Sequence, residues 1–98
     1  MPRRARIQIG FAKRETWGSV CEKVCHHFGV KEVELAGPSR ADVVARAREV
    51  CVYVGKTRLR MSGEDLARRF NQTESGISRA YYRASGWVKE EKWLWGDV

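Results

Sequence analysis

Apolar residues along the chain recur every three or four positions, which is the spacing of one face of an α-helix. Thr16 is a good helix N-cap, and Gly29 is the residue type that commonly ends a helix. The apolar stripe between them consists of Trp17, Val20, Cys21, Val24, Cys25 and Phe28. This pattern predicts a first helix over about residues 17–28. Residues 30–38 hold a Gly-Pro pair among charged positions, so we expect a connector with room for one turn of helix.

A second stripe starts close to Ser39 and Asp42, whose spacing is that of a capping box with Asp in place of the usual Glu. The stripe predicts a helix over about residues 40–57. Its apolar members are Val43, Val44, Ala47, Val50, Cys51 and Val54. Two shorter helices are expected to follow, the first capped by Ser62 and the second by Thr73.

The two short helices have the order of apolar and turn residues that is typical of a helix-turn-helix. Asn71 and Gln72 form the turn between them, because Asn tolerates the left-handed conformation. The second of these helices should stop near Gly86. The residues expected to be buried in the pair are Leu66, Ala67, Phe70, Ile77, Ala80, Tyr81 and Ala84. The pattern as a whole predicts a small all-α domain of four main helices.

Charge indicates the kind of partner. The chain has 98 residues and a formal net charge of +7, because 19 Lys and Arg residues exceed 12 Asp and Glu residues. Polyanions are therefore the natural partners. Arg outnumbers Lys, which suits nucleic acid because a guanidinium can fork onto a phosphate or onto the edge of guanine. The basic residues concentrate in residues 1–14 and 39–60.

Helical geometry exposes one polar face of the last helix, and we expect this face to enter the major groove of duplex DNA. The residues predicted to contact bases are Thr73, Glu74, Ser75, Ser78, Arg79 and Tyr82. Arg79 is suited to a bidentate contact with guanine, and Glu74 to accepting a hydrogen bond from cytosine. The residues predicted to contact the phosphate backbone or the minor groove are Arg40, Arg46, Arg48, Lys56, Arg58, Arg60, Ser62, Arg68, Arg69 and Arg83.

Three blocks of sequence carry a resemblance to a known family. They are Arg-x-Arg-Glu-Val-Cys-Val-Tyr-Val at residues 46–54, Met-Ser-Gly-Glu-Asp-Leu-Ala-Arg-Arg-Phe at residues 61–70, and Gly-Ile-Ser-Arg-Ala at residues 76–80. They resemble the C-terminal DNA-binding domain of the replication initiator DnaA. They are still more similar to the DnaA-like domain that follows the catalytic domain in transposases associated with repetitive extragenic palindromes. With the first helix, the resemblance covers about residues 16–84.

The resemblance implies a helical DNA-binding domain in which Arg48 matches the Arg that DnaA inserts into the minor groove. Three departures concern the target site. Glu49 stands where DnaA has Gln, the last helix begins Thr-Glu-Ser-Gly at residues 73–76 where DnaA has Asp-His-Thr-Thr, and the turn is one residue shorter. We therefore expect a target other than the DnaA box. Because no Gly-rich phosphate loop is present, initiator activity is not implied.

Length and composition fit one compact unit, so we do not expect a multidomain enzyme. We expect a basic N-terminal arm or linker at residues 1–15, the helix-turn-helix domain at residues 16–86, and a Trp-rich tail at residues 87–98 that packs on the domain. No apolar run is long enough to cross a membrane, and the start of the chain lacks the apolar stretch of a secretory signal. A bacterial cytoplasmic, nucleoid-associated location is expected.

Cys21, Cys25 and Cys51, with the adjacent His26 and His27, raise a zinc hypothesis, because two Cys one helical turn apart can share an ion. The first two thiols lie on the apolar stripe, however, so we expect buried cysteines that act as small hydrophobic residues, without a metal or a disulfide. The chemistry of the related transposases needs two His flanking one apolar residue, and the sequence lacks this spacing. We expect no catalytic activity and no cofactor.

The sequence therefore predicts a module without a catalytic domain, regulatory or transposase-related, that binds double-stranded DNA through a helix-turn-helix. Two alternatives stay open. The Trp-rich tail or the stripe of the first helix would serve a protein-interaction or oligomerisation module. Structured RNA would also suit the positive charge.

Overall fold

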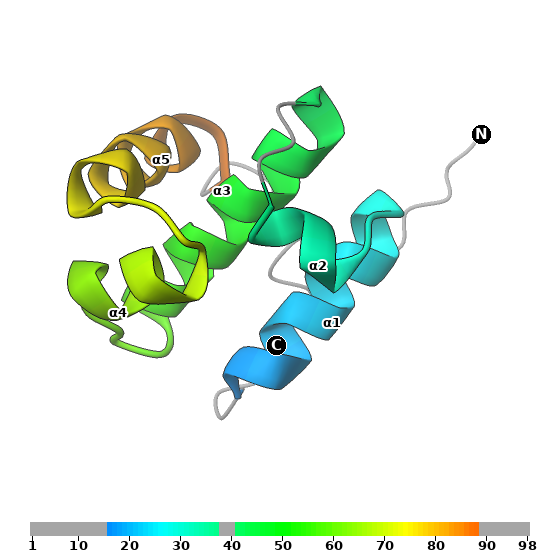
Figure 1. Cartoon of the computed structure of the whole chain (residues 1–98), viewed down its shortest axis with the longest axis horizontal. Coiled ribbons are helices and arrows are strands. Elements are labelled where there is room, and N and C mark those ends of the chain that lie inside the picture. The colour runs from blue at the N-terminus through cyan, green and yellow to red at the C-terminus, as the bar shows by residue number, and fades with distance from the viewer. Residues whose placement is uncertain (1–15, 38–40, 89–98) are drawn as a thin grey trace.

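The computed structural model describes residues 16–37 and 41–88, and its described part consists of helices and short connections (Figure 1). The helices are α1 (Trp17–Phe28), α2 (Glu32–Leu35), α3 (Asp42–Thr57), α4 (Gly63–Arg69) and α5 (Glu74–Trp87). The all-α prediction is confirmed, and the expected connector contains the short α2. Among the described residues, no helix is both long and apolar enough to span a bilayer.

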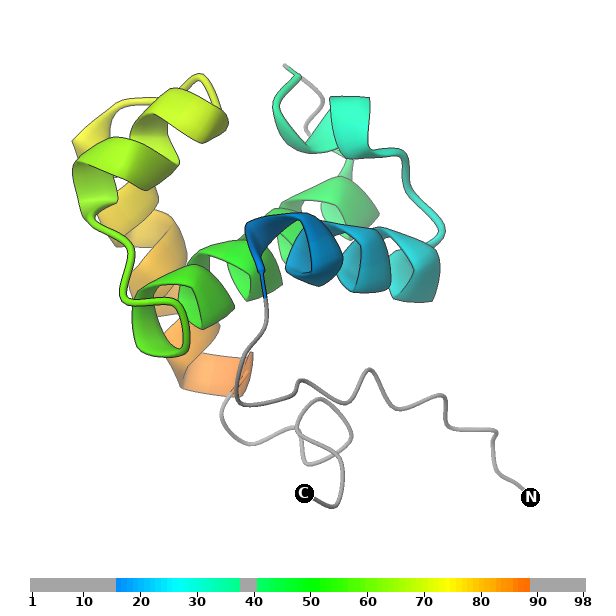
Figure 2. The ribbon, with the colours of Figure 1, turned by 90° about the horizontal axis from the view of Figure 1, so that it is seen from below.

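The long helix α3 is the centre of the fold, because it packs against each of the other four helices. The helices α1 and α2 lie on one side of it, and α4 and α5 lie on the other (Figure 2). A ring contact links the two sides, since Trp17 at the start of α1 meets Phe70 after α4 edge-to-face, with 5.4 Å between ring centroids. The helix-turn-helix is thereby fixed to the rest of the domain through α3 and this aromatic pair.

Capping residues begin and end α1 at the predicted positions. The Thr16 hydroxyl accepts from the Ser19 N–H at 3.1 Å, and the Ser19 hydroxyl accepts from the Thr16 N–H at 3.1 Å, which completes a capping box. Gly29 adopts the left-handed conformation, with φ of 70°, and Val30 N–H donates to the Cys25 carbonyl. These local signals are strong enough that the sequence alone places both ends of the helix.

The beginning of α3 differs from the prediction. The helix starts at Asp42 with Ala41 as its N-cap, and no side chain caps it. The predicted cap, Ser39, lies outside the described residues. Val43 was expected on the buried stripe but is 42% exposed, whereas Val44 is buried. One position along a helix turns a side chain by about 100°, so only one of two adjacent valines at this end can face the core.

The core is larger than one stripe for each helix. Val20, Val24, Val50, Leu66 and Ile77 are fully buried, and the cluster extends to Val52 and Val88, which the periodicity did not include. Because α3 has helices packed on both sides, its burial spreads around the helix. The stripe of α1 faces this core, so the alternative that it forms an oligomer interface is wrong.

Candidate nucleic-acid interface

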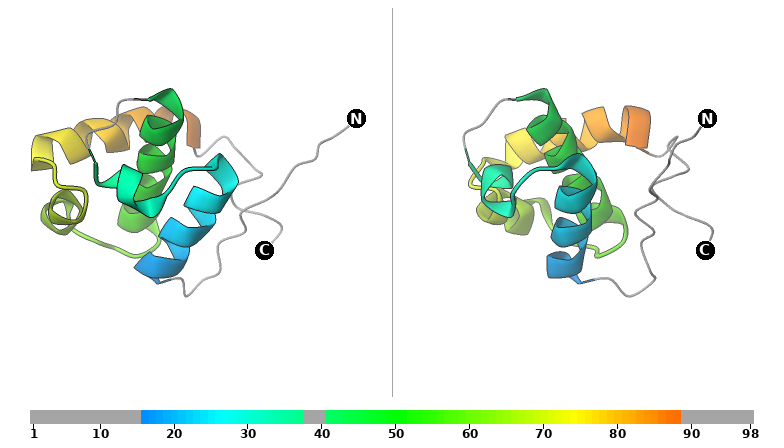
Figure 3. Two further views of the ribbon diagram at one scale, coloured as in Figure 1. Left: turned by 45° about the vertical axis from the view of Figure 1, so that its right-hand side comes forward. Right: turned by 90° about the vertical axis from the view of Figure 1, so that its right-hand side faces the viewer.

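The helix-turn-helix consists of α4, the turn at residues 70–73, and α5, and the two helices lie side by side at one end of the molecule (Figure 3). Asn71 has the predicted left-handed conformation, with φ of 56°. Gln72 N–H then donates to the Ala67 carbonyl at 2.8 Å, which closes the end of α4. Asn therefore performs here the turn that Gly more often performs in other proteins.

Side-chain caps begin both helices of the motif. The Ser62 hydroxyl accepts from the Asp65 N–H at 3.0 Å, and the Thr73 hydroxyl accepts from the Gly76 N–H at 3.0 Å. Both caps are as predicted. Ala67 and Ala80 are small and buried, which lets the helices cross closely, and Ile77 is fully buried between them and the core. The packing that was predicted for the motif is therefore confirmed, except that Tyr81 is only partly buried at the edge of the core.

One face of α5 is open to solvent. The structure places all six predicted base-contacting residues on it, and each of them is exposed: Thr73, Glu74, Ser75, Ser78, Arg79 and Tyr82. Tyr82, the last of these residues along α5, is 73% exposed, which is unusual for a large ring. We call these six residues the reading face. Within the described part of the chain, the Arg79 guanidinium has no hydrogen bond or ion pair. It can therefore bind a new partner without breaking an existing contact.

The cations on α4 have weak internal partners. Arg68 lies 3.7 Å from the carboxylates of Glu64 and Asp65, and Arg69 Nε lies 3.3 Å from Asp65 Oδ1. Arg69 also lies over the Trp17 ring, at 5.7 Å from the centroid. Exposed ion pairs of this kind contribute little to stability, so phosphates can replace the carboxylates at small cost.

A second group of cations lies where α3 turns into α4. Lys56 Nζ is 5.5 Å from the centre of the Tyr81 ring and adjoins Gly63, the first residue of α4. Arg58 follows the end of α3, and Arg60 is exposed with a left-handed φ of 57°. We call Lys56, Arg58 and Arg60 the loop cations. They lie beside the start of the helix-turn-helix, and their contact with phosphates stays a prediction.

Arg48 is not directed to solvent in the structure. Its Nε donates to the Leu35 carbonyl at 2.8 Å, and its Nη2 donates to the carbonyls of Glu34 and Gly37 at 3.3 and 3.4 Å. Partial burial lowers the pKa of this guanidinium from its ordinary value. A contact with the minor groove stays a prediction for Arg48, and it would require the side chain to leave the end of α2.

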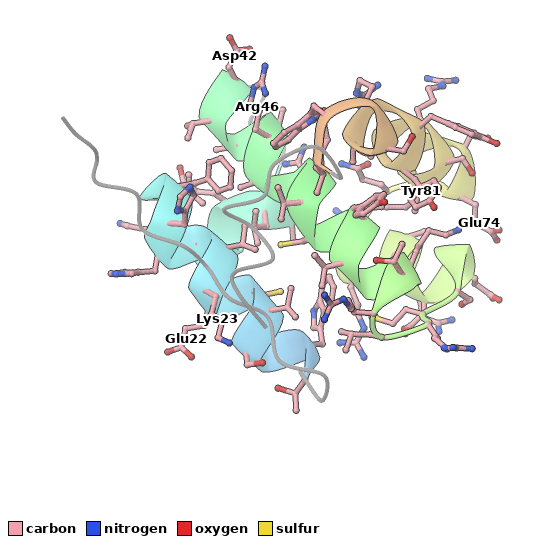
Figure 4. All side chains as sticks on the ribbon, turned by 180° about the vertical axis from the view of Figure 1, so that it is seen from behind. Glu22, Lys23, Asp42, Arg46, Glu74 and Tyr81 are labelled. Carbon is pink, nitrogen blue, oxygen red and sulfur yellow. The ribbon has the colours of Figure 1, made fainter. Side chains whose placement is uncertain are left out.

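Two further predicted cations lie far from the start of α5. Arg46 lies over the Trp87 ring, with 5.0 Å between its Cζ and the ring centroid. Arg83 Nε donates to Glu49 Oε2 at 3.0 Å. Figure 4 shows Arg46 near the beginning of α3, well separated from Glu74 at the beginning of α5. Arg40 lies outside the described residues. The predicted backbone contacts therefore do not form one continuous group.

Glu49 is the residue whose structural role the sequence did not reveal. Its side chain is 11% exposed, and it accepts hydrogen bonds from Arg83 and from Trp87 Nε1, the latter at 2.8 Å. The available signal was an acid placed directly before the buried Val50 and Cys51, with an Arg and a Trp four positions apart on a later helix. Nothing in local periodicity connects residues that are 34 and 38 positions apart.

The three cysteines are free thiols and are buried, as predicted. Burial raises the pKa of the Cys25 thiol to about 11. The pKa of the Cys51 thiol is also raised, first by a hydrogen bond with Cys21 and then by burial. The Cys25 and Cys51 thiols therefore stay protonated near neutral pH. All three buried cysteines act as small core residues. The described residues contain no group of three His, Cys, Asp or Glu side chains arranged to hold a metal ion.

Comparison of the sequence with known proteins identifies its family. The family model described as bacterial DnaA protein helix-turn-helix matches residues 18–83. A curated relative, the chromosomal replication initiator protein DnaA of Desulfatibacillum aliphaticivorans, is 29% identical over 84 residues, and the match covers 80% of this chain but 18% of the relative. No solved structure matches the chain significantly. The chain belongs to the bacterial DnaA helix-turn-helix family, a family of DNA-binding domains.

Proposed function

We propose that this domain binds a specific site in double-stranded DNA by inserting the start of α5 into the major groove. The observation that carries the proposal is the reading face, six exposed residues on α5 beside the turn. The fold supports it, because α4 and the core hold the opposite side of α5. The match to the initiator covers 18% of that protein, so we propose site binding for this chain rather than the activity of the whole initiator.

The residues of the reading face suit different parts of a base pair. Arg79 presents a planar fork that matches the two acceptors of guanine, and Glu74 is an acceptor suited to the amino group of cytosine. Ser75 and Ser78 are small, so the helix backbone can approach the floor of the groove. These residues differ from those of the initiator, and we propose a target site that differs from the DnaA box, in a regulatory or transposase-related setting.

Phosphate contacts would come from two groups of residues beside the reading face. The loop cations adjoin the start of α4, and Arg68 and Arg69 lie along α4 with carboxylate partners that exchange readily. Such contacts fix the orientation of a domain on the duplex without reading sequence. The alternative of a structured RNA target is tested by competition, because A-form helices have a deep and narrow major groove that α5 cannot enter.

Selection from a pool of random duplexes, followed by titration of the selected site, tests the proposal. With 6 to 10 phosphate contacts, affinity should fall by about 10³ to 10⁵ between 50 and 200 mM salt. Lys23→Ala is the control for the effect of overall charge on binding. It removes a positive charge from α1, away from Glu74 and the reading face (Figure 4). Binding that is independent of salt, or hairpin RNA that competes better than the selected duplex, would contradict the proposal.

A further inference from the structure

A buried carboxylate joins α3 to the second half of α5. Glu49 is 8% exposed as a residue, and its two oxygens have one donor each. Oε2 accepts from Arg83 Nε at 3.0 Å, and Oε1 accepts from Trp87 Nε1 at 2.8 Å. Because Arg83 and Trp87 are one helical turn apart, both donors approach from the same side of α5. The carboxylate therefore holds this helix at two points.

Two contacts one turn apart restrict a helix more than one contact does. They oppose both rotation of α5 about its axis and sliding along α3. Arg46 also contacts this part of α5, because its Cζ lies over the Trp87 ring, 5.0 Å from the ring centroid. The reading face is on the same rigid helix, so the setting that Glu49 imposes at Trp87 also decides which way Arg79 points. Side chains that read bases have to be held within about 0.5 Å and about 10–20° of the productive geometry.

The same carboxylate also neutralises a charge. Arg83 is one turn beyond Arg79, and 60% of its side chain is exposed, so a phosphate could reach it. To bind a phosphate, however, Arg83 would have to break its hydrogen bond with Glu49. The carboxylate would then stay buried with one of its two donors missing, which is costly. The surrounding depression has a volume of about 450 Å³, and it is lined by Asp42, Ala45, Arg46, Glu49, Arg83 and Trp87. Its charged residues are two acids and two bases, so it is not a cationic surface.

We infer that Glu49 is a positioning residue for DNA recognition: it sets the rotation of α5 and withholds the charge of Arg83 from the DNA backbone. This inference rests on the proposed function. Its consequence is that sequence discrimination and non-specific attraction are controlled separately. Arg79 supplies discrimination, and the carboxylate keeps Arg83 from adding a contact that every sequence would share.

The test compares the full chain with Glu49→Gln, Arg83→Gln and the double variant, on the selected duplex and on a random duplex over a range of salt. Glu49→Gln keeps the shape of the side chain but releases the charge of Arg83. We expect it to bind random duplex a few-fold more tightly, with a salt slope steeper by about 0.9, and to lose roughly ten-fold in specificity ratio. Arg83→Gln should leave the slope unchanged, and the double variant should return it to the wild-type value.

Trp87→Phe gives a second, independent reading and remains available if Glu49→Gln does not fold. It removes the indole N–H but keeps a ring beside Arg46 and leaves Arg83 paired with Glu49. The specificity ratio should fall while the salt slope stays at the wild-type value. Circular dichroism melts of every variant establish that the measurements are made on folded protein.

Three outcomes overturn the inference. If Arg83→Gln makes the slope shallower by about 0.9, Arg83 contacts a phosphate in the wild type. If Glu49→Gln weakens both duplexes equally with no change in slope, the carboxylate contributes to stability alone. If the wild-type chain binds no duplex, the proposed function fails and the inference with it, whereas the first two outcomes leave the proposed function intact.

Discussion

The two halves of α5 differ in how their arginines are held. Arg79 lies in the first half, exposed on the reading face, whereas Arg83 lies one turn further on and donates to the buried Glu49. The two residues have the same chemistry and share a helix, yet α3 supplies a carboxylate to the second and none to the first. The positions of arginines on a helix therefore do not by themselves predict which of them contact DNA. The neighbouring helix can supply a carboxylate that holds one guanidinium and leaves another exposed.

A similar contrast separates the middle of α3 from its C-terminal end. Near its middle, Arg48 donates to three backbone carbonyls that end α2. At its C-terminal end, Lys56 lies over the face of the Tyr81 ring and beside Gly63, at the start of the helix-turn-helix. Cations that hold the fold together and cations that suit phosphates therefore occupy different parts of the same helix. Substitutions can separate the two groups.

The largest effect is expected at the residue that fixes α5 to the core. Ile77 is fully buried where α4, α5 and the core meet, and Ile77→Ala should lower the free energy of unfolding by about 2–5 kcal/mol. Val33→Ala is a matched control, because Val33 is 74% exposed and its truncation should cost less than about 0.5 kcal/mol. Urea denaturation followed by circular dichroism measures both. Equal costs for the two variants would show that α5 is not docked as described.

Arg79→Ala should sharpen the contrast within α5 most directly. The change should weaken binding to the selected duplex by about 1–3 kcal/mol and relax the preference at one base pair. Stability should change by less than about 0.5 kcal/mol, because the residue lies on the surface. Repeating the selection with the variant measures the relaxed position. An unchanged preference at every position would remove Arg79 from the reading face.

Much of the fold follows from local signals in the sequence. Thr16 and Gly29 mark both ends of α1, and Asn71 marks the turn, because caps and left-handed residues act within a few positions of the chain. The exposure of the reading face also follows, since it is the far side of the predicted apolar stripe. Whether any residue contacts DNA stays a prediction.

What could not be predicted depends on contacts between distant segments. The bonds from Arg48 to α2 and from Arg83 to Glu49 each join positions far apart in sequence, and a guanidinium looks the same in the sequence whether it is held or exposed. Val43 shows the same limit for apolar residues. Periodicity identifies an apolar side of a helix, but it does not decide which of two adjacent valines faces the core; Val44 is buried and Val43 is exposed.

The cap of α5 should have a moderate effect. Thr73→Ala removes the hydroxyl that accepts from the Gly76 N–H, and we expect a loss of about 1 kcal/mol in stability. Thr16→Ala removes the equivalent cap of α1 at a similar cost, which makes it the matched control. Only Thr73→Ala should also weaken binding to the selected duplex in titrations on folded protein. Equal binding losses in both variants would attribute the effect to stability alone.

The smallest effect on binding is expected at Arg60, where a weaker contact with DNA should come without a loss of stability. An L-residue in the left-handed conformation costs about 1–2 kcal/mol, and glycine avoids this strain but adds about 0.5–1 kcal/mol of unfolded-state entropy. With φ of 57° at this position, Arg60→Gly should therefore leave stability unchanged or raise it by up to about 1.5 kcal/mol. If Arg60 is one of the loop cations that contact phosphates, the salt slope should become shallower by about 0.9. Arg60→Lys keeps both the charge and the strained backbone, so its slope should match the wild type. A shallower slope in a protein that is no less stable can arise only from a lost phosphate contact, whereas an unchanged slope would place Arg60 with Arg83, among the arginines that the duplex does not touch.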